Sequence, residues 1–250
     1  MLRILVLQTC DGSVYAPLLD YSQPKHEAYC RKHGYEYMRW DGIKKGQENY
    51  PGFAVFNKIY LLKEILKTGA YDWVVYLDAA TIILDLERPV EDFLHLNKVM
   101  IGCSEDKNTC DISFSLYNMN HPKLSILLDD WQQSFETNLG KDKTNQFKNG
   151  WPNFKSYNDQ LLLNEILKKK QSYAFLYDSN YFIYDTQFIG NIKRLRNMTV
   201  ETRLELLKEM DKSGFYKSTK NTLDSPPLPV PQQEQEQEQP PAMNVVSDQQ

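Results

Sequence analysis

The sequence predicts an α/β fold in which helices cover both faces of a mixed, mostly parallel central sheet. Short apolar runs of strand length alternate along the chain with longer segments whose apolar residues recur at helical spacing. Such alternation is typical of a parallel sheet, because a return to a parallel strand needs a crossover segment, usually a helix. Ligands of such sheets bind at the carboxyl ends of the strands, so polar residues at those ends are the first candidates for a site.

The strands are predicted from apolar runs bounded by polar or turn-forming residues. The first run opens the chain, is too short for a signal sequence and has no small-residue cleavage site. The third run ends on Asp78 and is followed almost at once by the apolar residues 82–84. The expected strands are 2–8, 35–40, 73–77, 98–102, 112–117, 173–177 and 181–184.

The helices are predicted from their periodicity and from residues that favour helix ends. Gly34 and Gly69 suit the left-handed position just after a helix, Pro122 suits a first helical position, and Asn158 suits an N-cap. We expect helices over about 22–33, over 57–67, from His121-Pro122 onward, from Asn158 onward and from near Thr199. Residues 138–156 are polar and predict a long surface loop.

The composition indicates one ordinary globular domain followed by a different segment. Hydrophobic residues make up 41% of the 250 residues, which suffices for a full core. From about residue 221 the chain becomes rich in Pro, Gln and Glu, a composition that cannot bury a core. We therefore predict a domain over 1–214 and a disordered tail, or a linker to further domains, over 215–250.

The charge and the cysteines narrow the classes of partner. A net charge of −4 argues against nucleic acid, which requires a basic face. No apolar run is long enough to span a membrane. The four cysteines form no CxxC pair, so we expect reduced thiols and a cytoplasmic protein. The motifs GxxxxGKS/T, GxGxxG, GxSxG and HExxH are all absent.

Six segments of the first 195 residues resemble the GT-A (Rossmann-like) glycosyltransferases, most closely the galactosyl/mannosyltransferase and glycogenin-like groups. In those enzymes a Lys-bearing helix precedes a strand that ends in Asp-x-Asp, and a later His-Phe-x-Gly-x-x-Lys segment completes the donor site. The segments here are YCRKHGYEY (29–37), FNKIYLL (56–62), DWVVYLDAATII (72–83), ISFSLYN (112–118), NDQ (158–160) and QFIGNIK (187–193).

The resemblance implies a site for a UDP-sugar and a divalent cation, Mn²⁺ or Mg²⁺. Asp78 matches the first metal-binding Asp, but Ala80 stands at the second Asp and Gln187 at the His, so metal binding should be weakened. The remaining residues that it assigns to the donor nucleotide and its diphosphate are Thr9, Cys10, Asp11, Lys58, Ala79, Gly190 and Lys193. It places Asp159 and Gln160 beside the transferred sugar as the catalytic pair. Asp159 would act as a nucleophile or an oxocarbenium stabiliser in a retaining reaction, or as a base in an inverting one.

The function implied is transfer of a sugar from a UDP-sugar to a glycan acceptor, with retention of configuration. The similarity is greatest to a domain at the N-terminus of chlorella-virus multidomain enzymes, which suggests L-rhamnose, a capsid N-glycan and the host cytoplasm. One alternative is a non-catalytic nucleotide- or glycan-binding module with a decayed site. Another is that Ala80 inactivates an otherwise active enzyme. Residue by residue, Asp78 could cap a turn, Lys58 could be a solvated lysine, and Asp159 could serve only the helix dipole.

Overall fold

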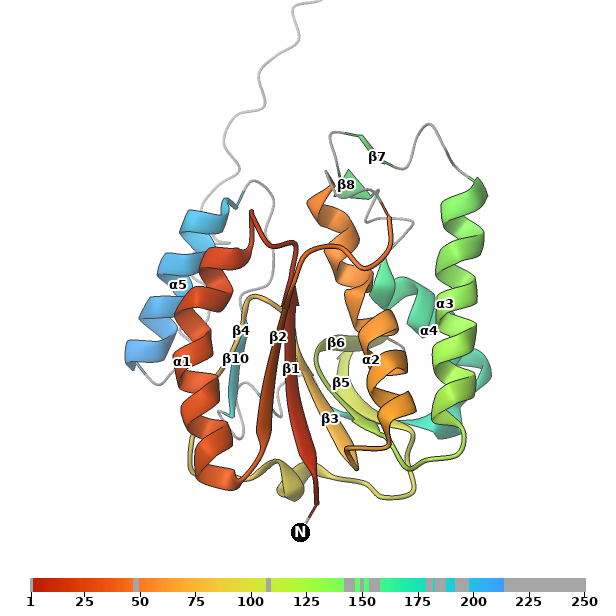
Figure 1. Cartoon of the computed structure of the whole chain (residues 1–250), viewed down its shortest axis with the longest axis horizontal. Helices are drawn as coiled ribbons and strands as arrows, with labels where there is room; N and C mark the ends of the chain where they lie inside the picture. Colours follow the sequence, from red (N-terminus) through yellow and green to blue (C-terminus); the bar gives the residue numbers. More distant parts are fainter. Residues whose placement is uncertain are drawn as a thin grey trace, which may run out of the picture. The chain divides into compact units, whose positions relative to one another are not determined.

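A six-stranded sheet with the order β2-β1-β3-β6-β5-β9 forms the centre of the computed structural model (Figure 1). The structure describes residues 2–46, 50–106, 109–141, 147–148, 151–152, 158–178, 182, 188–191 and 198–213. These residues belong to one compact unit, Met1–Tyr216. The predicted tail or linker over 215–250 lies outside the described residues, and it and the domain limit at 214 stay predictions.

The sheet is mixed and mostly parallel, as the sequence predicts. Neighbours β2, β1 and β3 pair in parallel, as do β5 and β9, and within this sheet β6 runs against both of its neighbours. Its strands are β1 (Ile4–Cys10), β2 (Glu36–Asp41), β3 (Trp73–Leu77), β5 (Met100–Asp106), β6 (Thr109–Asn118) and β9 (Ala174–Tyr177). Two further antiparallel pairs are β4 (Thr81–Ile83) with β10 (Ile189–Asn191) and β7 (Phe147–Lys148) with β8 (Trp151–Pro152).

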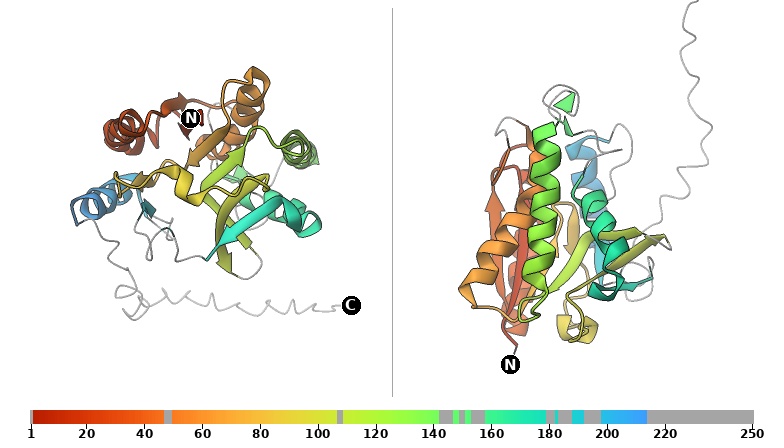
Figure 2. Two further views of the ribbon diagram at one scale, coloured as in Figure 1. Left: turned by 90° about the horizontal axis from the view of Figure 1, so that it is seen from below. Right: turned by 90° about the vertical axis from the view of Figure 1, so that its right-hand side faces the viewer.

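Helices cover both faces of this sheet. Figure 2 shows α1 and α5 on one side and α2 and α3 on the other, with α4 packed against α3. The helices are α1 (Ala16–His33), α2 (Asn57–Thr68), α3 (Leu124–Lys141), α4 (Asp159–Lys169) and α5 (Val200–Ser213). Short 3-10 helices are η1 (Pro51–Phe56), η2 (Val90–Phe93) and η3 (Gln171–Tyr173). No helix in the described ranges has a stretch long and apolar enough to cross a lipid bilayer.

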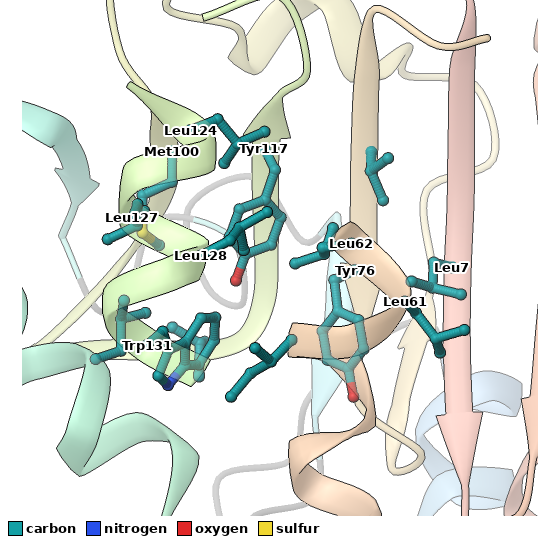
Figure 3. Close-up of a cluster of buried hydrophobic side chains, with 14 of the residues drawn as sticks. Leu7, Leu61, Leu62, Tyr76, Met100, Tyr117, Leu124, Leu127, Leu128 and Trp131 are labelled. Atoms are coloured by element: carbon teal, nitrogen blue, oxygen red, sulfur yellow. The ribbon is translucent and has the colours of Figure 1, made fainter. Parts of the chain in front are cut away.

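The strand residues alternate between two large apolar clusters, because successive side chains of a strand point to opposite faces. On the α2–α3–α4 face, Tyr76 lies beside Leu61 and Leu62 of α2, while Tyr117 faces α3 (Figure 3). On the other face, residues such as Val75 and Leu77 pack with α1 and with the aromatic residues Tyr29, Phe93, Phe114, Phe182 and Phe188. Both faces of the central strands are therefore shielded from solvent.

A third, smaller apolar cluster joins the segment after β3 to α1 and α5. Its buried members are Leu18 of α1, Ala80, Ile82 of β4, and Leu207 and Met210 of α5. Gly190 of β10 lies directly under this cluster, since a Cβ built on it would fall 1.9 Å from the Met210 sulfur. The absence of a side chain at residue 190 lets Met210 pack against the β4–β10 pair.

Most predicted elements are present, and the differences lie at their ends. Gly34 and Gly69 have φ angles of +74° and +62°, as a left-handed helix end requires. The first helix begins at Ala16 instead of about residue 22. Pro17 lies in its first turn, where a proline is tolerated, and the Asp11 carboxylate orders the preceding loop by accepting the N–H groups of Val14 and Tyr15.

Two predictions about the second half of the chain need correction. The helix expected from His121-Pro122 begins at Leu124, and the predicted loop over 138–156 is wrong where α3 continues to Lys141 and where β7 pairs with β8. The rest of that segment lies outside the described residues. The same holds for the predicted strand 181–184, except for the buried Phe182.

Replacing Asn158 with Ala tests the local signal that begins α4. The Asn158 Oδ1 accepts the Leu161 N–H at 2.7 Å, so we expect Asn158→Ala to lower the free energy of unfolding by about 1 kcal/mol. Asn158→Ser keeps a side-chain oxygen at this position and should cost much less. Urea denaturation of the three proteins measures the difference, and equal stability of the Ala and Ser variants would contradict the capping role.

Candidate functional site

The carboxyl ends of β1, β2 and β3 lie at one edge of the sheet, and the site is built there. Parallel register places Thr9 opposite Trp40 and Cys10 opposite Asp41, while Gln8 lies opposite Leu77, the residue before Asp78. The residues that follow these three strands therefore lie close together. Asn57, the first residue of α2, ties the ends of β1 and β2 together, because its Nδ2 donates to the carbonyls of Gly42 (2.8 Å) and Cys10 (3.5 Å).

Asp78 is held by its backbone and leaves its carboxylate partly open to solvent. Its N–H donates to the carbonyl of Ser113 on β6 at 2.8 Å, and its own carbonyl accepts the Thr81 N–H at 2.9 Å. The side chain is 42% exposed. Asp78 therefore presents a negatively charged group at the edge of the sheet without depending on that group for its own position.

Lys58 connects Asp78 to Asp159, although the two carboxylates come from distant parts of the chain. The Lys58 Nζ lies 3.2 Å from Asp78 Oδ1 and 2.6 Å from Asp159 Oδ2. It also lies 4.4 Å from the centre of the Tyr76 ring, which adds a cation–π contact. The Lys58 side chain is 1% exposed, so the reading of Lys58 as a solvated lysine is wrong.

Burial and electrostatic attraction act in opposite directions on the pKa values of Lys58 and Asp159, which form a triad with Asp78. Burial by itself would lower the pKa of Lys58, but the carboxylates of Asp159 and Asp78 outweigh it and raise this pKa well above its ordinary value. Burial and the nearby Asp78 carboxylate raise the pKa of Asp159 above its ordinary value, while the Lys58 ammonium and the Gln160 N–H oppose that rise. Lys58 is therefore a fixed positive charge, and its attraction is the main force that favours the ionised form of Asp159.

The amino end of α4 places Asp159. Asn158 caps this helix, and the Trp131 indole N–H of α3 donates to the Asp159 carbonyl at 3.0 Å. A carboxylate in the first turn also benefits from the helix dipole. Gln160, the other predicted catalytic residue, follows in the same turn with its side chain half-buried. Both therefore lie on one rigid helix end, with Asp159 facing Lys58.

The three residues predicted beside the nucleoside are each engaged within the protein. Thr9 Oγ1 lies 3.3 Å from the Tyr76 hydroxyl, and the Cys10 thiol donates to the Asp41 carboxylate at 3.0 Å. Burial and the Asp41 carboxylate raise the pKa of Cys10 to about 12, which excludes a reactive thiolate at neutral pH. The Asp11 carboxylate accepts the N–H groups of Val14 and Tyr15, in the loop just before α1. Their contact with a nucleoside stays a prediction.

Ala79 and Ala80 follow Asp78 directly, Gly190 pairs with Ile82 of β4, and all three lie at the apolar cluster between this segment, α1 and α5. Ala79 is half-buried, Ala80 is 2% exposed in the cluster with Leu18, and Gly190 lies under Met210. The side chain at position 80 thus points into the core of the α1–α5 layer. Close packing therefore explains the small residues at positions 80 and 190, independently of any contact with a donor.

The described residues offer a divalent cation only an incomplete set of ligands. Among them no group of three His, Cys, Asp or Glu side chains gathers at any point. Asp78 supplies an exposed carboxylate, so a cation would fit here only if donor phosphates and water supplied most of its ligands, as they often do for Mg²⁺. Gln187 and Lys193, the other predicted contributors, lie outside the described residues.

Sequence reasoning assigned no functional role to Gln8 or His26, although both contact the backbone of residues 78–83. Gln8 is fully buried and its Nε2 lies 3.2 Å from the Asp78 carbonyl. His26 Nε2 accepts the Ile83 N–H at 3.2 Å. The one available signal was a polar residue, Gln8, at the end of a buried strand. Nothing in the spacing of His26 connects it with residues 78–83.

The sequence matches no protein-family model and no curated protein, so the comparisons that inform on this chain are structural. The structure is similar to that of a glycosyltransferase involved in the glycosylation of the major capsid of PBCV-1, with a TM-score of 0.58 and 12% identity over 82% of this chain and 99% of that one. This chain has a glycosyltransferase fold. A weaker similarity links it to the glycosyltransferase GlyE of Streptococcus pneumoniae TIGR4, with a TM-score of 0.46 and 14% identity over 87% of this chain and 65% of that one.

Removing the Lys58 ammonium should leave a buried, unpaired carboxylate. We expect Lys58→Met to lower the free energy of unfolding by about 3–5 kcal/mol, and the double variant with Asp159→Asn to recover much of this loss. Lys63→Met is a matched control, since the Lys63–Asp129 pair joins α2 to α3 at the surface and should contribute no more than about 1 kcal/mol. Urea denaturation at pH 7 measures all four proteins. A loss as small as that of the control would contradict a buried ion pair.

Placing a carboxylate at position 80 should destabilise the protein instead of completing a metal site. We expect Ala80→Asp to lower the free energy of unfolding by at least about 2 kcal/mol, because the new charge would enter the apolar Leu18–Met210 cluster. Ala79→Asp, at the half-buried neighbouring position, should cost less. Thermal unfolding with and without Mn²⁺ tests both variants. A large Mn²⁺-dependent rise in the melting temperature of Ala80→Asp would show that the new carboxylate reaches a cation.

Proposed function

We propose that this protein is a glycosyltransferase that moves a sugar from a UDP-sugar donor to a glycan acceptor. The observation that carries the proposal is the Asp78–Lys58–Asp159 triad, which lies at the carboxyl edge of a sheet with a glycosyltransferase fold. In α/β sheets this edge is where ligands bind. The triad combines one exposed carboxylate with one that is buried and charge-paired.

The two carboxylates suit different parts of the transfer. In a retaining reaction the bond between the anomeric carbon and the β-phosphate oxygen breaks, and its electron pair leaves with UDP. The acceptor hydroxyl oxygen forms the new bond on the same face of the sugar, and its proton passes to the departing phosphate oxygen. The Asp159 carboxylate, paired with Lys58, would stabilise the positive charge that develops on the sugar ring. Asp78 would face the diphosphate.

A divalent cation, Mn²⁺ or Mg²⁺, would supply neutralisation of the departing diphosphate when it is bound. Asp78 is the described residue that would hold it, and Lys193 is proposed as a further positive charge on the phosphates. The ammonium of Lys58 is not available for that purpose, because it is buried and already contacts two carboxylates.

The donor and acceptor follow from the family resemblance and form the finer part of the proposal. We propose a UDP-hexose or UDP-L-rhamnose as donor and an N-linked glycan of a viral capsid protein as the first acceptor to test, acted on in the host cytoplasm. A second candidate is a binding module that holds a nucleotide or glycan without transfer. The apolar surroundings of Ala80 favour it, since they exclude a second acidic ligand from that position.

Replacing Asp78 with Asn removes its charge with little change of shape and tests the proposed function directly. We expect wild-type protein to bind UDP by calorimetry and to release UDP from a UDP-sugar in the presence of acceptor. Asp78→Asn should lower this turnover by on the order of 100-fold, because charge stabilisation at the diphosphate is lost.

Asp129→Asn provides the control, because Asp129 also pairs with a lysine but lies on the outer surface of α3. It should keep wild-type turnover. Binding of UDP without turnover of any donor would favour the binding module. Failure of wild-type protein to bind any UDP species, with or without Mn²⁺, would overturn the proposed function.

A further inference from the structure

Gln8 lies directly beneath the turn that follows Asp78 and holds two of its carbonyls. The Gln8 side chain is fully buried at the carboxyl end of β1. Its Nε2 donates to the Asp78 carbonyl at 3.2 Å and to the Thr81 carbonyl at 3.3 Å. A single amide group therefore spans the two ends of the turn from Asp78 to Thr81.

Three donors fix the other end of the same amide. Gln8 Oε1 accepts from the Tyr37 hydroxyl at 2.9 Å, faces His26 Nδ1 at 3.1 Å, and accepts from the Ser22 hydroxyl at 3.3 Å. Ser22 and His26 are both fully buried. Since backbone carbonyls can only accept, the Gln8 amide cannot reverse without losing contacts at both ends.

His26 extends the same network to β4. Its Nε2 accepts the Ile83 N–H at 3.2 Å, so the ring proton lies on Nδ1 and points to Gln8 Oε1. Burial, with a smaller contribution from Lys25 and against that of Asp211, lowers the pKa of His26 to about 3, so the ring is neutral at neutral pH. Gln8 and His26 together thus bind three backbone groups of the segment 78–83.

This segment has little else to fix it from within. Ala79 and Ala80 carry no polar side-chain atoms, and the Asp78 carboxylate is partly exposed. Further restraints are the Asp78–Ser113 backbone bond, the Thr81–Asp78 turn bond and the Thr81 hydroxyl on the Ser113 carbonyl at 3.3 Å. The residues Thr81–Ile83 also pair with Ile189–Asn191 of β10, which restrains the far end of the segment but not Asp78 itself. The direction in which Asp78 presents its carboxylate therefore depends strongly on the side chains beneath it.

We propose that Gln8 and His26 are positioning residues, which hold the Asp78–Ile83 segment so that the Asp78 carboxylate faces Lys58 and the donor site. This inference rests on the proposed function for the meaning of Asp78, but the clamp itself is a property of the fold. Gln8 acts on the turn through its two carbonyls. His26 acts through Gln8 and through the N–H of Ile83.

The decisive experiment combines amide hydrogen exchange with donor kinetics in Gln8→Met, which keeps length and removes both hydrogen-bonding groups. We expect faster exchange at the Thr81 and Ile83 amides, roughly tenfold or more if local opening becomes easier. We expect kcat to fall by about 10- to 100-fold with a smaller change in KM for the UDP-sugar, because misplacement of a reacting group costs rate more than binding.

Asn118→Leu is the matched control, because Asn118 is also a buried amide that binds backbone, through Leu96 and Asn120, at the opposite edge of the sheet. It should lower global stability without changing exchange at Thr81 or kcat. Wild-type exchange and wild-type kcat in Gln8→Met would overturn the proposal. So would an equal loss of kcat in the control.

If Gln8→Met does not fold, two variants of His26 test the proposal instead. Glutamine places an acceptor where Nε2 lies and asparagine places a donor where Nδ1 lies, so His26→Gln should retain protection at the Ile83 amide and His26→Asn should lose it. Equal protection in both variants would overturn the role of His26. If wild-type protein neither binds nor turns over any UDP-sugar, the proposed function fails, while the exchange measurements still decide whether the clamp exists.

Discussion

The buried ammonium of Lys58 is the constraint on which the candidate site depends. It lies between Asp78 after β3 and Asp159 at the start of α4, and it packs on the ring of Tyr76. A buried ammonium in this position is stable because two carboxylates pair with it, and it in turn opposes the rise that burial causes in the pKa of Asp159. The burial of Lys58 and Asp159 is therefore favourable only when α2 and α4 are both packed against the sheet.

The short segment after Asp78 is shaped by different forces on its two sides. On one side, the buried amide of Gln8 and the ring of His26 hold its backbone. On the other, Ala80 and Ile82 pack into the apolar layer of α1 and α5. The hydrogen bonds on the polar side fix the orientation of the backbone, because hydrogen bonds are directional. The apolar packing on the other side fixes how far the segment is buried. This division explains how a turn with two alanines can present a carboxylate at a fixed place.

Local patterns in the sequence predicted the ends of helices correctly where a residue type strongly favours one position at a helix end. Gly34 and Gly69 end helices because the left-handed conformation costs glycine little, and Asn158 caps α4 because its side chain reaches the Leu161 amide. The same reasoning failed at α1. Its first turns, from Ala16, follow a loop that the Asp11 carboxylate orders through the N–H groups of Val14 and Tyr15, and apolar periodicity does not report such contacts.

The sequence by itself determined the α/β class, the order of the helices and of the strands of the central sheet along the chain, and the position of Asp78 at the end of a buried strand, because these follow from periodicity and from local backbone preferences. It did not predict the short strands β4, β7, β8 and β10. Only the tertiary structure decided that Lys58 is buried between two carboxylates, that Ala80 faces the core, and that Gln8 and His26 support the turn. These facts depend on contacts between residues far apart in the chain, such as Lys58 with Asp159. No local pattern records them, since each residue would look the same on a solvated surface.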